Sequence, residues 1–361
     1  MIDEALEQIR VAHRLPALAA AAVRNGELVA IGVTGVRKFG AEPTVTQEDR
    51  WHIGSCTKSM TSSLAGVLVE DKKIRWETAV GEVFPELAGK MKPAWRAVTL
   101  EQLLTHHGGA PANAPAALWR AAYRRTGTPL AQRLAFVGGL LAAEPEAASG
   151  SKFIYSNQGY AIAGAMLERV MKTPWEDLMR HRLFQPLGLS SAGFGAPGED
   201  ERNAKSSGRP RAGGATITQP WGHVASAGKL QPVEPGPDAD NPPAIGPAGT
   251  VHCSIGDLAR YAGWHAQSGS RGRGLLAPES FQKLHRAQPG DNYAMGWRVL
   301  ERSWAGGTAL THAGSNTMWY AVMWVAPGKE LALVAATNIA GPSAEMACDE
   351  AATALLKIAL R

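Results

Sequence analysis

Apolar residues recur at helical spacing at the beginning of the chain and then give way to two apolar runs. Ile2, Leu6 and Ile9 fall on one face of a helix. In the stretch ALAAAAVRNGELVAIGVTGV, Asn25-Gly26 separates two apolar runs, a pattern typical of a β-hairpin. The chain is therefore predicted to begin with a helix followed by two paired strands.

A second helix is predicted directly after Ser55, because Met60, Leu64, Val67 and Leu68 share one helical face. From about residue 76 to about residue 192 the pattern is mostly helical. The segment LEQLLTHHGG is expected to end a helix at its two glycines, and YAIAGAMLERVM carries regularly spaced apolar residues on one face. The middle of the chain is thus predicted to be helical.

The region between Pro210 and Pro247 contains eight prolines. Proline cannot donate a backbone hydrogen bond, so this density excludes helices and central strands. We expect a loop with at most an edge hairpin around WGHVASAGKLQPV.

Near the end, MWYAVMWVAPGKELALVAATN predicts two apolar strands around Pro327-Gly328, and a last helix is expected after Ser343. Strands at both ends of the chain suggest one sheet assembled from the two termini. The predicted organisation is a discontinuous α/β domain of residues 1–80 and 245–361. A mainly helical domain, residues 81–244 with the proline-rich loop, is inserted into it.

Composition excludes several classes of function. The hydrophobic fraction of 45% is that of a globular protein, and the net charge of +5 is spread along the chain without a basic run, which argues against a nucleic-acid partner. Three cysteines cannot all pair, and no Cys/His spacing suggests a metal site. The N-terminus resembles neither a signal peptide nor a membrane anchor. We expect a cytoplasmic protein without a membrane partner.

Ser55 and Lys58 are three residues apart in the segment HIGSCTKSMTSS. In a helix this spacing puts the two side chains on one face, with Cβ atoms about 5–6 Å apart. A serine hydroxyl becomes a nucleophile when a neighbouring base takes its proton, and lysine is such a base only if burial or another cation lowers its pKa. The alternative is that Ser55 caps the helix and Lys58 is a solvated side chain.

Two later segments complete a pattern. Tyr155-Ser156-Asn157 precedes the helix YAIAGAMLERVM, and His312-Ala313-Gly314 leads into an apolar strand. The ordered motifs S-x-x-K, Y-x-N and H-x-G resemble those of the serine β-lactamase-like and penicillin-binding-protein-like hydrolases. These include class C β-lactamases, D-alanyl-D-alanine carboxypeptidases and family VIII carboxylesterases. The phrases TLEQLLTHHGGAP, GPAGTVHCSIGDLARYA and YAMGWRVL look like the same family.

The resemblance implies an α/β (α+β) fold with an antiparallel sheet flanked by helices. It implies that Ser55 is acylated, that Lys58 holds or accepts its proton, and that Tyr155 acts with Lys58 as a general base. A tyrosine can do so as a phenolate only if neighbouring cations lower its pKa.

For the rest of the site, the resemblance assigns Asn157 to the acyl part of the substrate and to fixing Lys58. The backbone N–H groups of Ser55 and Ser315 would form the oxyanion hole, and Gly314 would keep the strand open for the substrate. Taken singly, Tyr155 could be a core tyrosine, Asn157 a helix cap and His312 a strand-edge histidine.

Other reactive side chains are interpreted structurally. Cys56 is expected to be a small buried residue because nothing pairs it with a base, and His106-His107 are expected to cap a helix end. No metal or organic cofactor is implied.

The sequence departs from class C β-lactamases at His312, where those enzymes usually carry lysine. Neutral histidine lacks the permanent charge that would bind a substrate carboxylate. The substrate is expected to be a small-molecule ester, amide or β-lactam, with a broad short-chain carboxylesterase activity first. A β-lactamase, a D-amino-acid peptidase or amidase, and a non-catalytic ligand-binding relative are the alternatives. Fold and motif fix the chemistry but not the natural acyl group, its chirality or the oligomeric state.

Overall fold

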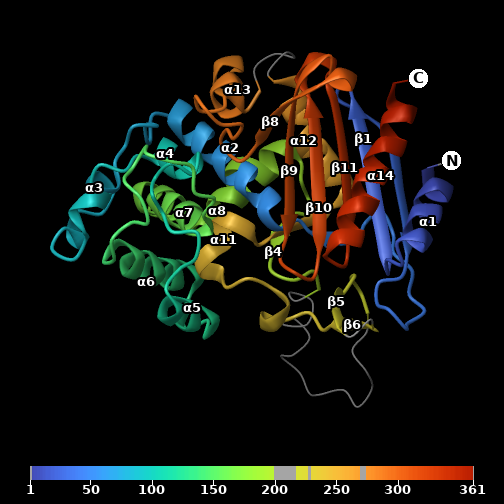
Figure 1. Ribbon diagram of the computed structural model, residues 1–361, viewed down its shortest axis with the longest axis horizontal. Coiled ribbons are helices and arrows are strands. Elements are labelled where there is room, and N and C mark those ends of the chain that lie inside the picture. Colours follow the sequence, from blue (N-terminus) through green and yellow to red (C-terminus); the bar gives the residue numbers. More distant parts are fainter. Residues whose placement is uncertain (1, 199–216, 227–228, 269–273, 361) are drawn as a thin grey trace.

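A six-stranded antiparallel sheet forms the centre of the α/β part in the computed structural model, which describes residues 2–198, 217–226, 229–268 and 274–360 (Figure 1). The strand order is β2-β1-β11-β10-β9-β8. The strands are β1 (Ala17–Arg24), β2 (Glu27–Gly35), β8 (Arg298–Arg302), β9 (Gly307–Ser315), β10 (Tyr320–Ala326) and β11 (Leu331–Thr337). The N-terminal hairpin thus pairs with the C-terminal strands, which confirms the predicted sheet from both ends of the chain.

Helices cover both faces of this sheet. On one face lie α1 (Ile2–Ala12) and α14 (Pro342–Ala359), and on the other lies α12 (Ile255–Gln267) (Figure 1). Successive residues of β1 alternate between the two cores, with Ala19 and Ala21 in one, and Leu18 and Ala20 in the other. Burial on both faces explains why β1 is an uninterrupted apolar run.

The helical part lies beside the sheet, on the side away from α1 and α14 (Figure 1). At its centre α7 packs against α2, α4, α6 and α11. The bounds are α2 (Thr57–Glu70), α3 (Val80–Val83), α4 (Leu100–Leu104), α5 (Ala116–Tyr123), α6 (Pro129–Leu141), α7 (Asn157–Met171), α8 (Trp175–Met179), α9 (Gln185–Leu187), α11 (Gly246–Gly249) and α13 (Pro278–His285). Among the described residues, none of these helices has the apolar length needed to cross a membrane.

Two small sheets complete the fold. One has the order β3 (Arg50–His52), β7 (Val251–Ser254) and β4 (Gly193–Phe194), and the other pairs β5 (Gly222–Ser226) with β6 (Lys229–Val233). The β5–β6 pair confirms the hairpin expected in the proline-rich region, while residues 210–216 and 227–228 of that region lie outside the described residues. The division into domains 1–80 with 245–361 and 81–244 stays a prediction.

Several elements were not predicted from the hydrophobic pattern. They are β8, β9, α12, α13 and the three-stranded sheet. The sequence of β9, GTALTHAGS, is small and polar, so its strand conformation depends on pairing with β10 rather than on its own propensity. The His312–Gly314 triplet consequently lies inside a strand, not before one.

Candidate active site

Ser55 lies in a tight turn between β3 and α2, where Gly54–Cys56 form one turn of 3-10 helix. Gly54 has a φ of +50°, and a Cβ atom there would lie 2.3 Å from the backbone nitrogen of Ser315. Only glycine allows both this conformation and this approach. The turn that carries Ser55 is therefore pressed against the end of β9.

Gly314, on β9, is a second glycine in close contact with the turn that carries Ser55. A Cβ atom at this position would lie 2.1 Å from the carbonyl oxygen of Ile53 and 2.5 Å from the backbone nitrogen of Ser55. Glycine was expected here to admit the substrate, but the group that approaches it is the Ser55 turn itself. The close contact brings Ser315, the next residue of β9, beside the Ser55 turn, as two oxyanion-hole donors require.

Cys56 fixes the turn rather than reacting. Its Sγ atom contacts the carbonyl oxygens of His312 at 3.3 Å and Ala321 at 3.8 Å. Burial raises the pKa of its thiol to about 12, so the thiolate does not form at neutral pH. The interpretation of Cys56 as a small buried residue is confirmed.

Lys58 reaches from the first turn of α2 to three oxygen atoms. Its Nζ atom lies 3.0 Å from Ser55 Oγ, 2.7 Å from Asn157 Oδ1 and 3.0 Å from the carbonyl oxygen of Ala248. The side chain is fully buried, and burial lowers its pKa to about 7. Lys58 is therefore largely neutral just above neutral pH.

The partners of Lys58 also fix the direction of its lone pair. A neutral amine carries two hydrogens, and the oxygens of Asn157 and Ala248 can only accept hydrogen bonds. Both hydrogens are used there, so the lone pair faces the Ser55 hydroxyl. In its neutral form Lys58 is consequently oriented as a base toward Ser55.

Tyr155, two residues before the start of α7, lies over Lys58. The Lys58 Nζ atom is 4.7 Å from the centre of the phenol ring, and the Tyr155 hydroxyl hydrogen-bonds that of Ser55. Tyr155 as a whole is 38% exposed, yet desolvation of its phenol raises its pKa to about 12 in spite of that bond. A phenolate is thus disfavoured, and Tyr155 keeps its proton at neutral pH.

Asn157 begins α7, and its side chain is directed to Lys58 rather than to the helix end. The helix is capped by Ser156, whose Oγ accepts a hydrogen bond from the backbone N–H of Gly159 at 3.1 Å. Asn157 therefore binds Lys58, the contact expected from the motif.

His312 is buried and has both ring nitrogens occupied. Nδ1 is 2.6 Å from the carbonyl oxygen of Ala313, which can only accept, so this nitrogen carries the hydrogen. Nε2 then accepts from the Tyr293 hydroxyl at 3.0 Å. Burial, reinforced by the charge of Lys58, lowers the pKa of His312 to about 3. The ring is neutral at physiological pH.

An aromatic cluster around Tyr155 was not foreseen. His106 lies 4.5 Å and Tyr293 lies 6.3 Å from its ring centre, and Tyr160 packs behind Lys58. His106 and His107 cap the end of α4, as expected: His106 is left-handed, its N–H donates to the Leu103 carbonyl oxygen at 3.3 Å, and the His107 N–H donates to the Gln102 carbonyl oxygen at 2.7 Å. The His106 side chain in addition accepts a hydrogen bond from the Ser156 N–H. His106, Tyr293 and Ala248 lie in the family-like phrases TLEQLLTHHGGAP, YAMGWRVL and GPAGTVHCSIGDLARYA, which were the signal that pointed to them, whereas Tyr160 begins the predicted helical segment YAIAGAMLERVM.

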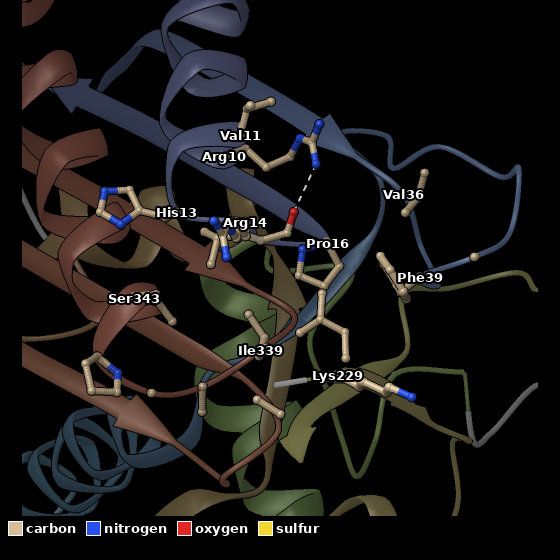
Figure 2. Close-up of a pocket in the computed structure, with 18 of the residues that line it drawn as sticks. Arg10, Val11, His13, Arg14, Pro16, Val36, Phe39, Lys229, Ile339 and Ser343 are labelled. Carbon is tan, nitrogen blue, oxygen red and sulfur yellow. Dashed lines mark hydrogen bonds between the residues drawn. The ribbon is translucent and has the colours of Figure 1, made fainter. Parts of the chain in front are cut away.

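A group of metal ligands or a large cavity would also be a candidate functional site. In the described part of the chain, no three His, Cys, Asp or Glu side chains gather as metal ligands. A cavity of about 990 Å³ lies elsewhere, between the end of α1 and the β11–α14 connection, where Phe39 and Ile339 line it (Figure 2).

Comparison with known proteins agrees with the motifs. A family model described as Beta-lactamase matches residues 2–357. Penicillin-binding protein 4 of Amycolatopsis lactamdurans is 26% identical over 348 residues, covering 93% of this chain and 84% of the relative. A beta-lactamase of Escherichia coli is 26% identical, covering 80% of this chain and 67% of the relative. Lovastatin esterase of Penicillium rubens is 27% identical over 47% of this chain and 46% of its own length.

Solved structures share the fold. An octameric penicillin-binding protein homologue from Pyrococcus abyssi superimposes with a TM-score of 0.75 at 22% identity, covering 99% of this chain and 76% of that chain. The structure of SurE superimposes with a TM-score of 0.78, also at 22% identity, covering 100% and 75%. The antiparallel sheet flanked by helices is thus confirmed as the penicillin-binding-protein and β-lactamase fold. The chain belongs to the beta-lactamase family, whose members are serine hydrolases.

Proposed function

We propose that the protein hydrolyses small neutral esters through an acyl-enzyme on Ser55. Neutral Lys58 takes the proton of Ser55, and Oγ attacks the substrate carbonyl carbon. The resulting oxyanion is bound by the N–H groups of Ser55 and Ser315. Tyr155 gives its proton to the departing alkoxide and recovers one from Lys58. Water then attacks the acyl carbon, so that the acid is released and Ser55 regains its proton.

The observation that carries the ester preference is the neutral state of His312. Its two ring nitrogens are bonded to Ala313 and Tyr293, and its pKa of about 3 leaves no charge there above acidic pH. A carboxylate on the substrate would find no permanent cation at this motif. Short-chain esters place no charge in the site, and the relative named lovastatin esterase supports this class.

The proposal is tested by comparing kcat/KM for p-nitrophenyl butyrate and for a chromogenic cephalosporin with the wild-type protein. We expect the ester to be favoured by at least about a hundredfold, because acylation needs no carboxylate site. Ser55→Ala, which removes only the nucleophile, is the control for non-enzymatic hydrolysis. Cephalosporin turnover faster than ester turnover would overturn the proposed substrate class.

Arg298 favours a second candidate, the hydrolysis of carboxylate-bearing β-lactams or D-peptides. It begins β8, directly opposite Thr311 on β9, and is exposed. Burial raises the pKa of Tyr155, and the Arg298 charge opposes that rise, so the guanidinium acts on the site from nearby. Arg298→Gln separates the two candidates. A loss of kcat/KM confined to anionic substrates favours the second candidate. The same fold-change in kcat/KM for neutral and anionic substrates favours the ester.

A further inference from the structure

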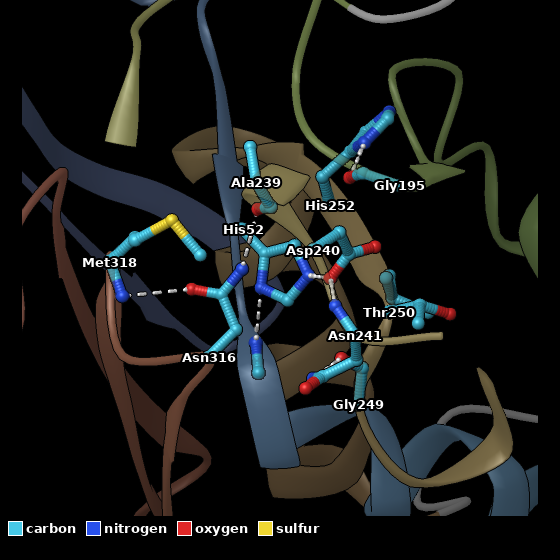
Figure 3. Close-up of polar contacts among 12 residues, drawn as sticks. His52, Gly195, Ala239, Asp240, Asn241, Gly249, Thr250, His252, Asn316 and Met318 are labelled. Atoms are coloured by element: carbon cyan, nitrogen blue, oxygen red, sulfur yellow. Dashed lines mark hydrogen bonds and ion pairs between the residues drawn. The ribbon is translucent and has the colours of Figure 1, made fainter. Parts of the chain in front are cut away.

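A buried dipeptide, Ala239-Asp240, lies between the two backbone segments that carry the oxyanion-hole donors (Figure 3). On one side His52 Nε2 is 2.7 Å from Asp240 Oδ1. On the other side Asn316 Nδ2 donates a hydrogen bond to the carbonyl oxygen of Ala239 at 3.1 Å. Asp240 thus binds the segment before Ser55, and its neighbour Ala239 binds the segment after Ser315.

His52 transmits its contact with Asp240 to the nucleophile turn. The backbone N–H of Gly54 donates to His52 Nδ1 at 3.1 Å, so Nδ1 carries no hydrogen and Nε2 donates to Asp240. Gly54 directly precedes Ser55, and His52 is fully buried. The ring therefore connects Asp240 to the peptide that leads into the first oxyanion-hole N–H.

Asn316 does the same for the second donor. It directly follows Ser315 and is 6% exposed. While its Nδ2 binds Ala239, its Oδ1 accepts a hydrogen bond from the backbone N–H of Met318 at 3.2 Å. Both ends of the amide are used, which fixes the turn after β9 in one orientation (Figure 3).

Further hydrogen bonds hold the loop that contains the Ala239-Asp240 dipeptide. The Arg125 guanidinium donates to the carbonyl oxygens of Asp240 at 2.6 Å and Asn241 at 3.0 Å. Asn241 Nδ2 donates to the carbonyl oxygen of Gly249 at 2.8 Å, one residue from the Ala248 oxygen that binds Lys58. The same loop is thus tied to both oxyanion-hole segments and to the base.

We propose that His52, Ala239, Asp240 and Asn316 form an oxyanion clamp, in which His52 and Asn316 are positioning residues. They set the relative placement of the Ser55 and Ser315 N–H groups without touching the substrate. The inference rests on the proposed function, because it concerns the same oxyanion hole. Displacement of a donor by a fraction of an ångström weakens binding of the transition state more than binding of the substrate.

Two variants test the clamp, each with a matched control. His52→Phe keeps a ring but removes both contacts, and His252→Phe is its control, because His252 is equally buried directly opposite on β7 and binds Gly195 (Figure 3). Asn316→Ala removes the hydrogen bond between Asn316 and the carbonyl oxygen of Ala239. Its control is Asn338→Ala, since Asn338 is a buried asparagine that contacts the β2–β3 loop.

The readout is turnover per active site, with active sites counted by fluorophosphonate labelling of Ser55. We expect kcat per labelled site to fall at least about tenfold in His52→Phe and in Asn316→Ala, with KM nearly unchanged. We expect the control variants to lower the melting temperature and the labelled fraction but to leave kcat per site unchanged. An unchanged kcat per site in either folded clamp variant would overturn the proposal, and Asn316→Ala decides the question if His52→Phe does not fold.

Amide hydrogen exchange tests the clamp independently of the proposed ester hydrolysis. In His52→Phe we expect faster exchange in the segment of residues 313–318, although His52 lies on another strand. Unchanged exchange there would contradict a link through Ala239-Asp240. A wild-type protein that hydrolyses no ester, amide or β-lactam would contradict the proposed function, while the exchange measurement would still decide whether the clamp exists.

Discussion

The Nζ atom of Lys58 lies 3.0 Å from Ser55 Oγ in a fully buried environment. The burial lowers the pKa of Lys58 to about 7, and two carbonyl oxygens take the hydrogens of its neutral form. In the proposed mechanism the nucleophile and its base are therefore three residues apart in the chain, and the base is oriented by one side-chain amide oxygen and one backbone carbonyl oxygen. This relationship determines how activity and stability respond to pH.

The pH profile of ester hydrolysis should report the neutral fraction of Lys58. We expect kcat/KM for p-nitrophenyl butyrate to rise about tenfold per pH unit below about pH 7 and to level off above it, because only the neutral amine accepts the Ser55 proton. Initial rates at constant ionic strength measure this profile. A kcat/KM that still rises above about pH 9 would contradict the lowered pKa, because that is the behaviour of a lysine with an ordinary pKa.

Lys58→Met should inactivate the protein and make it more stable. A lysine whose folded-state pKa is lowered binds fewer protons folded than unfolded between about pH 7 and 10.5, so wild-type stability rises with pH across that window. Methionine removes the buried amine and its cost. We expect a gain of about 1–4 kcal/mol in the free energy of unfolding at pH 6.5, smaller at pH 10. Urea unfolding at both pH values measures it, and a loss of stability at pH 6.5 would count against the buried neutral lysine.

Gly314→Ala should damage the site through the backbone. The new Cβ would lie 2.1 Å from the Ile53 oxygen and 2.5 Å from the Ser55 nitrogen, so the nucleophile turn must move. We expect kcat to fall by about a hundredfold or more, and stability by about 1–3 kcal/mol. Gly138→Ala is the matched control: its Cβ meets nothing within 4 Å on α6, and it should keep full activity. Equal activity of the two variants would refute the close contact.

Selectivity between neutral and anionic substrates should not depend on the charge of His312. Because its pKa is about 3, the ring stays neutral from about pH 5 to 8. The ratio of kcat/KM for p-nitrophenyl butyrate to that for an ester bearing a carboxylate should be constant over that range, since the Lys58 titration affects both substrates alike. A ratio that shifts toward the anionic ester near pH 6 would show that His312 becomes protonated.

The sequence motifs predicted which side chains meet at the site better than they predicted the structure that supports them. Ser55, Lys58, Tyr155 and Asn157 come together as expected, because helix geometry fixes the first pair and a helix start presents the second. The close approach of the Ser55 turn to Gly314 was not predicted, because the two segments are distant in sequence.

The supporting contacts depend on tertiary structure alone. His52 and Asp240 are 188 residues apart, and no periodicity relates a strand-end histidine to a loop aspartate. Likewise, the motif could not show that desolvation raises the pKa of Tyr155, and so disfavours a phenolate, because that effect depends on the surrounding fold. The hairpins at Asn25-Gly26 and Pro327-Gly328 were predictable because turn chemistry is local.

The central claim, an acyl-enzyme on Ser55, is tested most directly by trapping the intermediate. The wild-type protein is mixed with p-nitrophenyl butyrate, quenched in acid during turnover, digested and analysed by mass spectrometry, with Ser55→Ala treated in parallel. The account predicts one butyryl group, on the peptide that contains Ser55, and none on the variant. Butyrylation of Cys56 or of another serine, or rapid hydrolysis by Ser55→Ala, would contradict it.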